Sequence, residues 1–433
     1  MIMIPSIHRL CRSRLLGFLP LCVAILAFPA RGADWSGFRG GPALGVSSES
    51  NLPVTWSGQE HVLWSTALPG WGDSSPSIVG DRIYLTSQTE NHDLHVLAVH
   101  RDTGNVLWAR KVGSGSLKSH ELQNMATPTP VSDGRHVWAF FGTGLLVCLD
   151  AAGEVVWQLD LQKQEVPFNI QWGMATSPVL HESGLYIACL HSGPSYVLAL
   201  DAATGKVRWK TDRNIGPENE ARDVYATPIV HQGRLVVSGA NFINAYHLQS
   251  GAQEWICGGL EVPHPYGRTI AGPTAAGDTL VTVASGFRNQ GLVMAVRAGG
   301  QGDVTDSRRL WTVKRYAPDC PTPVVYEGLV YFVRDDGLAS CVDLKTGEPH
   351  WQERLVPGST KISPVAGDGK IYFLNNQANC TVIKAGPKLE VLANNELGEQ
   401  TLCTPAISGG RVFIRTREHL RAIGAETRTA SAR

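Results

Sequence analysis

The sequence has few charged residues and no excess of either sign. Asp, Glu, Lys and Arg make up 18% of the chain, and 38 basic residues balance 38 acidic ones. A chain without excess positive charge lacks the general basic field of a nucleic-acid-binding protein, so we predict no nucleic-acid partner. After residue 32, no stretch approaches the roughly 18 continuous apolar residues of a membrane span. We therefore expect no transmembrane segment in the mature chain.

Cysteine is sparse and forms no metal-binding or disulfide pattern. Of nine cysteines, Cys11 and Cys22 lie in the N-terminal segment. The remaining seven include no adjacent pair and no C-x-x-C motif, and their number is odd, so no disulfide framework is specified. Most of them lie in apolar runs such as residues 146–149. This placement favours a role as small buried hydrophobic residues.

The motifs of several enzyme classes are also missing. The chain contains no phosphate-binding loop, no G-x-S-x-G nucleophile elbow and no H-E-x-x-H zinc motif. No trio of nucleophile, base and orienting group can be assigned without geometry. We predict no catalytic residues and no metal site, and lean against an enzyme.

The first 32 residues have the pattern of a secretory signal peptide. Arg9, Arg12 and Arg14 precede an apolar stretch at residues 15–27, and Ala30-Arg31-Gly32 offers small residues at positions −3 and −1 of a cleavage site. We predict that residues 1–32 are removed and that the mature protein is periplasmic or secreted. An uncleaved anchor is the alternative.

Glycine and proline, by contrast, are abundant and recur in a fixed order. A Ser-Pro, Thr-Pro or Gly-Pro step repeats every 41 to 52 residues, and a glycine followed by a β-rich run comes four to six residues later. This order is typical of a hairpin whose first strand begins at the proline, where no ladder hydrogen bond is lost. The prolines are Pro76, Pro128, Pro178, Pro228, Pro273, Pro323, Pro364 and Pro405.

A second hairpin follows in most repeats. An Asp-Thr-Gly type of turn precedes a tryptophan, and the glycine lies four residues before Trp108, Trp157, Trp209, Trp255 and Trp351. Trp311 follows a longer insertion, residues 298–309, whereas the seventh repeat has Val391 and Leu392 near this position. We predict that each tryptophan fills the gap between neighbouring repeats.

Two hairpins per repeat predict an all-β fold, an eight-bladed β-propeller of four-stranded antiparallel blades over residues 61–425. The eighth repeat lacks its fourth strand. Residues 61–68, which contain Trp64, supply the best donor, so an N-terminal strand is expected to close the ring. We expect the leader, residues 33–60, to pack on the outside through Trp35, Phe38 and Trp56, and residues 426–433 to form a tail.

The Asp-x-x-Thr-Gly-x-x-x-Trp units resemble the repeats of pyrroloquinoline-quinone (PQQ) dehydrogenases and of BamB-type lipoprotein propellers. The leader motifs Trp35-Ser36-Gly37-Phe38-Arg39-Gly40 and Leu52-Pro53-Val54-Thr55-Trp56 resemble those of PQQ-like β-propeller repeat proteins. The resemblance covers about residues 35–425. It implies the fold and leaves the function open, because propellers serve as enzymes, scaffolds and binding modules.

The resemblance also implies an alternative function, that of a PQQ- and Ca²⁺-dependent oxidoreductase. Trp172 would then stack on the cofactor, and Asp223 or Glu218 would act as base or metal ligand. The chain lacks the adjacent Cys-Cys pair usual in those dehydrogenases, and Trp172, like Trp71, is equally explained as part of a repeated loop. We therefore predict no cofactor, with PQQ and Ca²⁺ as the alternative.

Loops that join one blade to the next are expected to gather at one mouth of the central channel. They carry aromatic, amide and charged side chains that suit a sugar, peptide or protein ligand. Polar loops that only hydrate the mouth are an equally good interpretation. The candidate ligand-binding residues are Trp71, His120, Asn124, Gln171, Trp172, Glu218, Asp223, Tyr225, Tyr266 and Arg268.

Together these features predict an exported, non-catalytic propeller that acts as a binding or scaffold module for a protein or cell-envelope ligand. A PQQ-dependent oxidoreductase and a carbohydrate-binding propeller are the alternatives.

Overall fold

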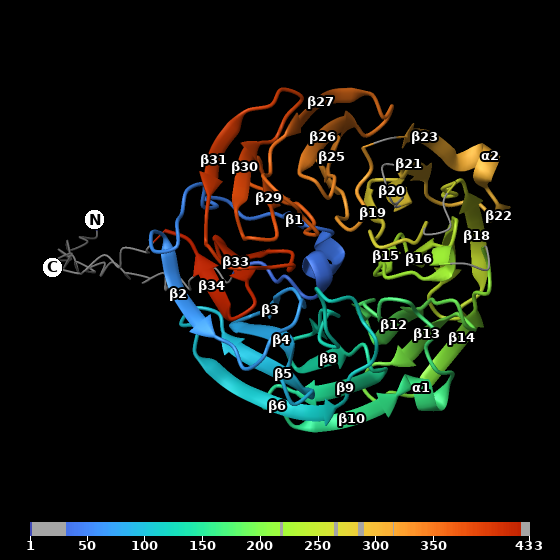
Figure 1. The fold of residues 1–433 in the computed structure, drawn as a ribbon, viewed down its shortest axis with the longest axis horizontal. Coiled ribbons are helices and arrows are strands. Elements are labelled where there is room, and N and C mark those ends of the chain that lie inside the picture. The colour runs from blue at the N-terminus through green and yellow to red at the C-terminus, as the bar shows by residue number, and fades with distance from the viewer. Residues whose placement is uncertain (2–31, 217–219, 264–266, 285–289, 315, 426–433) are drawn as a thin grey trace. The chain divides into compact units, whose positions relative to one another are not determined.

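Eight sheets stand around a central channel, and each corresponds to one sequence repeat (Figure 1). The computed structural model describes Met1 and residues 32–425, apart from 217–219, 264–266, 285–289 and 315. The chain from Gly32 onward forms one compact unit. The predicted eight-bladed propeller of four-stranded antiparallel blades is confirmed.

In blades 1 to 7 the four blade strands run in chain order from the channel to the outside, with an antiparallel register. Blades 1 to 4 contain β3 (Ser77–Val79), β4 (Arg82–Gln88), β5 (Asp93–His100) and β6 (Val106–Ser114); β7 (Val131–Ser132), β8 (His136–Phe140), β9 (Leu145–Asp150) and β10 (Val155–Asp160); β11 (Val179–His181), β12 (Gly184–Cys189), β13 (Tyr196–Asp201) and β14 (Val207–Asp212); β15 (Ile229–His231), β16 (Arg234–Gly239), β17 (Phe242–His247) and β18 (Gln253–Gly258). Blades 5 to 7 contain β19 (Thr274–Ala276), β20 (Thr279–Ala284), β21 (Leu292–Arg297) and β23 (Arg309–Lys314); β24 (Val324–Tyr326), β25 (Leu329–Val333), β26 (Leu338–Asp343) and β27 (Pro349–Arg354); β28 (Val365–Gly367), β29 (Lys370–Leu374), β30 (Cys380–Lys384) and β31 (Val391–Asn395).

Blade 8 is built from both ends of the described chain. It contains β32 (Ala406–Ser408), β33 (Arg411–Arg415), β34 (His419–Ile423) and, as its outer strand, β2 (Val62–Ala67). In Figure 1 the blue β2 lies beside the red β34, and Trp64 pairs with Ala422 in their antiparallel register. The predicted N-terminal closing strand is confirmed.

The repeated proline step begins each blade. Every such proline directly precedes the innermost strand, and in blade 2 this residue is Pro130, two positions after the predicted Pro128. The residue before the proline is a Ser or Thr in seven blades and Gly272 in blade 5. Its backbone N–H donates to the hydroxyl of the equivalent residue in the next blade.

Six of these hydroxyl links are formed among the described residues. The donor and acceptor pairs are Ser75 to Thr129, Thr129 to Ser177, Ser177 to Thr227, Gly272 to Thr322, Thr322 to Ser363 and Thr404 to Ser75, at 2.8–3.1 Å. The last pair joins blade 8 to blade 1. The hydroxyls therefore satisfy buried backbone donors and tie neighbouring blades together at six junctions around the channel.

The repeated tryptophans tie the blades together at the outer side of the ring. Each indole ring lies against a turn of the next blade, and its N–H donates to a backbone carbonyl there at 2.8–3.3 Å. The pairs are Trp64 to Arg101, Trp108 to Ala151, Trp157 to Ala202, Trp209 to Leu248, Trp311 to Leu344 and Trp351 to Gly386. These six tryptophans therefore lie between neighbouring blades.

Trp255 is the exception, because the insertion before β23 changes its surroundings. This insertion forms β22 (Gly302–Asp303), which pairs in parallel with β18, and the short α2 (Thr305–Arg308). Trp255 pairs with Gly302 and is 1% exposed, but its indole N–H has no acceptor in the described part of the chain. The insertion thus covers the outer edge of blade 4, an edge that is otherwise open.

The predicted packing of the leader on the outside is wrong. Trp35 pairs with Ile78 of the innermost strand β3, and β1 (Val46–Ser47) extends blade 7 at its channel side by pairing with β28. Between them η1 (Phe38–Ala43) lies in the centre of the ring, where it contacts inner strands of blades 1, 4 and 8 (Figure 1). The inner strands of eight blades leave a channel with free strand edges, and the leader fills one part of it.

The last part of the leader crosses blade 7. The ring of Trp56 stacks on Tyr372 at 6.4 Å between centroids, and its backbone N–H donates to Asn395 Oδ1 at 2.8 Å. Trp35 and Trp56 are both buried, at 1% and 5% exposure. These apolar residues cover the interior of the ring and not its outer surface.

Two further observations concern the whole described chain. Six of the seven mature-chain cysteines are buried in the blades and Cys320 is half-buried; all seven are free thiols. No helix among the described residues has the length and apolar character needed to cross a bilayer.

Candidate functional site

A cavity of about 640 Å³ occupies the channel on the side where the inter-blade loops gather. Loops of all eight blades line it, and the six residues whose hydroxyls accept the inter-blade hydrogen bonds lie around its wall. Phe38 of the leader lines both this cavity and a smaller one of about 270 Å³, so it lies between the two. The channel is therefore a pocket with an internal floor.

Five of the ten predicted ligand-binding residues line this cavity, namely His120, Gln171, Trp172, Tyr225 and Arg268. Trp71, Asn124 and Asp223 lie in the same loops without lining it. Glu218 and Tyr266 lie outside the described residues. The described loops therefore meet at the cavity, and their side chains divide into a lining set and a bracing set.

Trp172 is the best-fixed aromatic side chain of the lining. Its indole N–H donates to Glu220 Oε1 at 2.8 Å, and its backbone carbonyl accepts from the backbone N–H of His120 and from the amide of Gln123. The His120 ring meets it edge-on at 5.3 Å, and Lys118 Nζ lies 5.8 Å from the ring centroid. Contacts from two loops thus hold the ring in place before any ligand arrives.

A line of alternating charges continues from Trp172 along the wall. Arg268 lies between Glu220, at 3.6 Å, and Asp319, at 3.1 Å. Asp335 is ion-paired with Lys361 and accepts hydrogen bonds from the backbone N–H groups of Asp319 and Cys320.

Burial affects the protonation of this charged line. It raises the pKa of Asp335, an effect that Lys361 opposes and the neighbouring Asp319 reinforces. Burial alone would lower the pKa of Lys361, but its interactions with Cys320 and Asp335 hold it above its ordinary value. The wall therefore carries paired charges across blades 4 to 7.

The opposite wall carries a single acid beside two arginines. Burial raises the pKa of Asp73 to about 7, although the charges of Arg415 and Arg417 and a hydrogen bond with Thr127 act against the shift. Arg415 is fully buried and donates to Ser74 and to the carbonyl of Thr86. Asp73 thus changes its charge near neutral pH at the edge of the cavity.

The bracing set has structural roles that the sequence did not indicate. The carboxylate of Asp223 accepts from the backbone N–H of Gln171 at 2.8 Å and from the N–H and hydroxyl of Ser192 at 2.9 and 2.7 Å. Asn124 donates to the carbonyl of Trp71 at 2.8 Å and accepts from the N–H of Ala126 at 2.9 Å. The polar atoms of these side chains are therefore already hydrogen-bonded within the protein, where they hold loops together.

Trp71 belongs to the same group. It forms an isolated bridge with Gln88, and the guanidinium of Arg417 lies 4.4 Å from its ring centroid. Its ring therefore already has a cation on one face.

Several lining residues were not among the predicted ten. Glu220 begins the short helix η2 (Glu220–Arg222), and Asp335, which braces the lining residues Asp319 and Cys320, lies in the turn between β25 and β26. The inter-blade hydroxyls did have a sequence signal, because a Ser or Thr precedes the proline in seven of the eight repeats.

Among the described residues, those that line the cavity do not fit a Ca²⁺–PQQ pair. Calcium takes about six to eight oxygen ligands, often from several carboxylates. Here Glu220 and Asp319 are paired with Arg268, and Asp335 with Lys361. The proposed base Asp223 is 2% exposed and faces backbone donors.

Two clusters of possible metal ligands occur among the described residues. In the first, Cys320 stands between Asp319 and Asp335, and burial raises the pKa of its thiol well above the ordinary value. In the second, Glu399 accepts from the backbone of Glu418 and is paired with His419 and Arg421. Both acids of the first cluster, and Glu399 of the second, already have partners within the protein.

No set of nucleophile, base and orienting group converges on the cavity within the described part of the chain. The lining hydroxyls accept backbone hydrogen bonds in the inter-blade links, as Thr129 and Ser177 do. His120 Nδ1 accepts from the backbone N–H of Leu122 at 3.2 Å. The aromatic ring, amides and paired charges of the lining suit the binding of a ligand.

Comparison with known proteins places this geometry in a family. A family model described as outer membrane protein assembly factor BamB matches residues 31–170 and 142–388. Outer membrane protein assembly factor BamB of Yersinia pestis is 24% identical over 318 residues, which cover 71% of this chain and 75% of that protein. A polyvinylalcohol dehydrogenase of a Pseudomonas species is 27% identical over 167 residues, or 35% of this chain and 24% of that enzyme.

The fold comparison agrees. The crystal structure of BamB from Moraxella catarrhalis superposes with a TM-score of 0.61 at 14% sequence identity, covering 84% of this chain and 98% of that one. At this level of identity the likeness concerns the fold alone.

Proposed function

This chain belongs to the PQQ-like β-propeller family described as outer membrane protein assembly factor BamB, and from that premise we propose that it is an exported, non-catalytic propeller that binds a protein of the cell envelope through the mouth of its channel. The observation that carries the proposal is the closed-floored cavity on which loops of all eight blades converge around Trp172. A rigid ring that presents many loops at one mouth is a typical binding scaffold.

The lining favours a polypeptide ligand. Trp172, held by Glu220, gives a rigid aromatic contact, a residue type enriched at interface hot spots. Gln171 beside it is exposed, and paired charges at Arg268 and Asp319 offer both donors and acceptors. A mixture of aromatic, amide and charged groups around a pocket matches the anatomy of protein interfaces.

The proposed location is the periplasm or the cell exterior. The N-terminal arginines, the apolar stretch and the small residues before residue 33 support export with cleavage of the signal.

The test compares protein capture by wild type and two mouth variants. The purified mature protein is immobilised and incubated with cell-envelope extract, and any retained protein is identified, purified and titrated against Trp172→Ala and Gln171→Ala. We expect Trp172→Ala to weaken binding at least tenfold, corresponding to about 1.4 kcal/mol or more. Leu107→Ala, at an exposed position on the outer strand β6, is the matched control and should bind as wild type.

Two results would count against the proposal. One is retention of no protein above the level of a blank matrix. The other is equal binding by wild type and both mouth variants, which would move the contact away from the cavity. Binding on a glycan array without protein capture would favour the carbohydrate alternative.

A further inference from the structure

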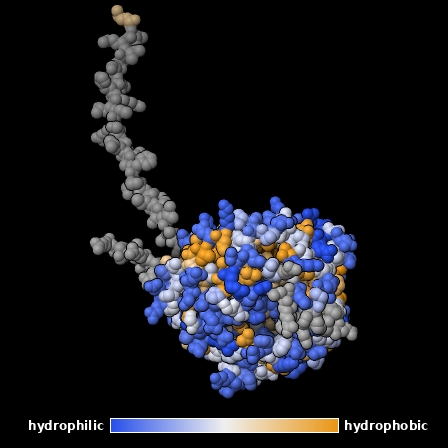
Figure 2. Space-filling view, turned by 45° about the horizontal axis from the view of Figure 1, so that its top comes forward, coloured by the Kyte–Doolittle hydropathy of each residue, from blue (hydrophilic) through white to orange (hydrophobic). Residues whose placement is uncertain are grey.

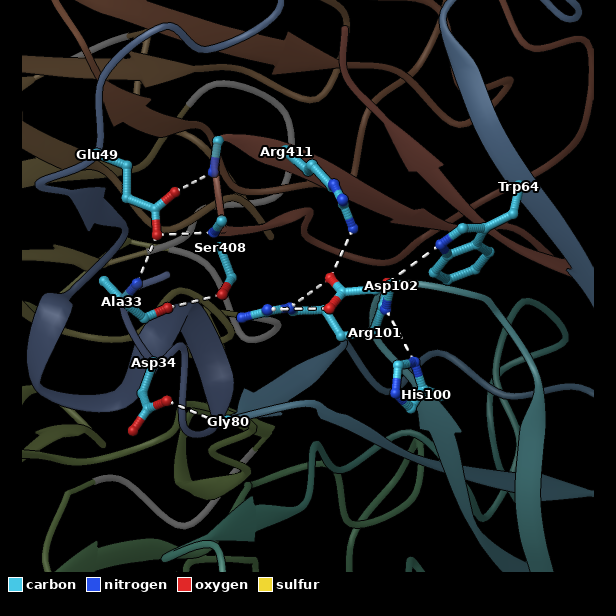
Figure 3. A network of polar contacts seen from close by, with 12 residues as sticks. Ala33, Asp34, Glu49, Trp64, Gly80, His100, Arg101, Asp102, Ser408 and Arg411 are labelled. Atoms are coloured by element: carbon cyan, nitrogen blue, oxygen red, sulfur yellow. Dashed lines mark hydrogen bonds and ion pairs between the residues drawn. The ribbon is translucent and has the colours of Figure 1, made fainter. Parts of the chain in front are cut away.

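The first described residues of the leader are fixed at the junction of blades 8 and 1 (Figure 3). The backbone N–H of Ala33 donates to Glu49 Oε1 at 2.5 Å. The same carboxylate accepts from the backbone N–H of Gly409, at 2.7 Å, and from that of Gly410. Glu49 therefore joins the start of the leader to the turn between β32 and β33.

The residues around Ala33 are anchored on both sides of this junction. The hydroxyl of Ser408 in blade 8 donates to the carbonyl of Ala33 at 2.7 Å. Asp34 accepts from the backbone N–H of Gly80 in blade 1 at 2.9 Å, and Trp35 pairs with Ile78. Contacts with blades 8 and 1 thus fix the chain on both sides of the Ala33 carbonyl.

Gly32 fits this place only because it has no side chain. A Cβ atom built on Gly32 would lie 2.2 Å from the backbone nitrogen of Gly409 and 2.4 Å from its Cα. Gly32 is therefore crowded against the backbone of Gly409, whereas Ala33 itself is exposed.

We propose that Ala33 is the N-terminus of the mature protein and that Glu49 is the binding site of its α-ammonium group. Hydrolysis of the Gly32–Ala33 peptide bond by the export peptidase consumes one water, leaving a carboxylate on Gly32 and a protonated amine on Ala33. The neutral amide donor becomes a cation with three donors, at a position already within hydrogen-bond distance of a carboxylate. Removal of the signal thereby turns one hydrogen bond into an ion pair that holds the leader in the ring.

Other charged side chains lie near Gly409, and they are paired with one another. The guanidinium of Arg101, from the turn of blade 1, lies near Gly409 and is paired with Asp102, which also holds Arg411. These three residues are drawn beside Glu49 and Ala33 in Figure 3. The carboxylate of Asp34 accepts a hydrogen bond from the backbone N–H of Gly80. Glu49 is thus the carboxylate in contact with the Ala33 nitrogen.

The first measurement identifies the N-terminus. The full-length chain is expressed with its own leader, the exported protein is purified, and its intact mass and N-terminal peptide are determined. A chain that begins at Ala33 is expected. A chain that begins at another residue overturns the proposal.

The second measurement tests the ion pair through the reactivity of the amine. Acylation of the α-amino group near pH 7 is followed by mass spectrometry, because only the neutral amine reacts and a nearby carboxylate favours the charged form. We expect the wild-type amine to react about three- to tenfold more slowly than that of Glu49→Gln. The amide oxygen of the variant can still accept from the Gly409 or Gly410 N–H.

Two controls complete the experiment. Glu60→Gln removes an exposed carboxylate of the same leader and should leave the rate as in wild type. The wild-type amine should also react more slowly in the folded protein than in urea at the same pH, a comparison that does not require Glu49→Gln to fold. Equal rates in folded and unfolded wild-type protein overturn the proposal, and so do equal rates in wild type and a folded Glu49→Gln. Neither result bears on ligand capture by the channel mouth.

Discussion

At the scale of single residues, the site is governed by whether a polar group already has a partner within the protein. Asp223 and Asn124 have the side chains expected of ligand-binding residues, yet both are satisfied by backbone groups of neighbouring loops. Their chemistry was readable from the sequence, but their partners lie 31 to 53 residues away. Which polar loop residues bind and which brace is decided by these distant contacts.

Asp73 gives a prediction at this scale. Because burial raises the pKa of its carboxyl to about 7, the folded state binds the proton more tightly than the unfolded state. The stability that the proton contributes is full below the ordinary pKa and is lost as the pH rises through about 7. The open cavity screens part of the effect, so we expect wild type to lose about 1–2 kcal/mol relative to Asp73→Asn between pH 4 and 8.

The measurement is the free energy of unfolding in urea at several pH values for both proteins. The matched control is Asp81→Asn, which removes a carboxyl that is 67% exposed and should run parallel to wild type. If Asp73→Asn also runs parallel to wild type, the carboxyl is ionised over this whole range and the inferred shift is wrong.

At the scale of strands and turns, the contact between tryptophan and glycine sets the spacing of the blades. The ring of Trp157 lies on Gly205 of the next blade, as that of Trp108 lies on Gly153. The turn needs glycine because its φ is positive. The tryptophan ring of the preceding blade also needs glycine there, because a Cβ atom would collide with the ring. The Asp-Thr-Gly and Trp motifs of one blade thus serve two different interfaces.

Gly205 and Gly233 separate these two requirements. Their φ angles are +71° and +72°, but a Cβ on Gly205 would lie 2.9 Å from the Trp157 ring, whereas a Cβ on Gly233 meets nothing within 4 Å. We expect Gly233→Ala to cost about 1 kcal/mol, from the backbone alone. Gly205→Ala should cost about 1–3 kcal/mol more, because the indole must shift.

Urea unfolding of the two variants tests this difference. A lower midpoint for Gly205→Ala than for Gly233→Ala is the expected result. Equal losses in the two variants would mean that the ring moves freely and that the indole contact does not set the blade spacing.

The leader shows what the pattern of single elements leaves undetermined. Trp35, Phe38 and Trp56 identify a segment that must cover apolar surface, but their spacing is the same whether that surface is outside the ring or inside it. The outcome depends on the width of the channel, which is a property of eight assembled blades. The residue pairs Trp35–Ile78 and Val46–Ala366 become visible only in the folded ring.

At the scale of the whole molecule, the ring could be predicted because its information is local and repeated. Each blade is a pair of hairpins marked by its own Pro, Gly and Trp residues, and the missing strand of blade 8 has one good donor in the leader. The cavity was predictable in position only. Its floor comes from Phe38, and its charged wall comes from Glu220, Arg268 and Lys361 in three different blades.

The pairing of β2 with β34 closes the ring, and an engineered disulfide between these two strands tests how much the whole ring depends on it. Ser65 and Arg421 are in register in β2 and β34, one position beyond the pair formed by Trp64. The equivalent pair inside blade 6 is Ser340 and Gln352, beside Trp351. Double cysteine variants therefore place the same cross-link once across the closure and once within a hairpin.

Because β2 is held to the ring by a pairing that no short loop enforces, we expect its release to be an early step of unfolding. The closure cross-link spans ~356 residues and the hairpin cross-link ~12, so chain entropy predicts gains of about 6 and about 3 kcal/mol over the reduced forms. Thermal unfolding of each variant, oxidised and reduced, measures these gains. If the closure cross-link stabilises the protein no more than the hairpin cross-link does, the ring first opens elsewhere and its integrity does not depend on β2.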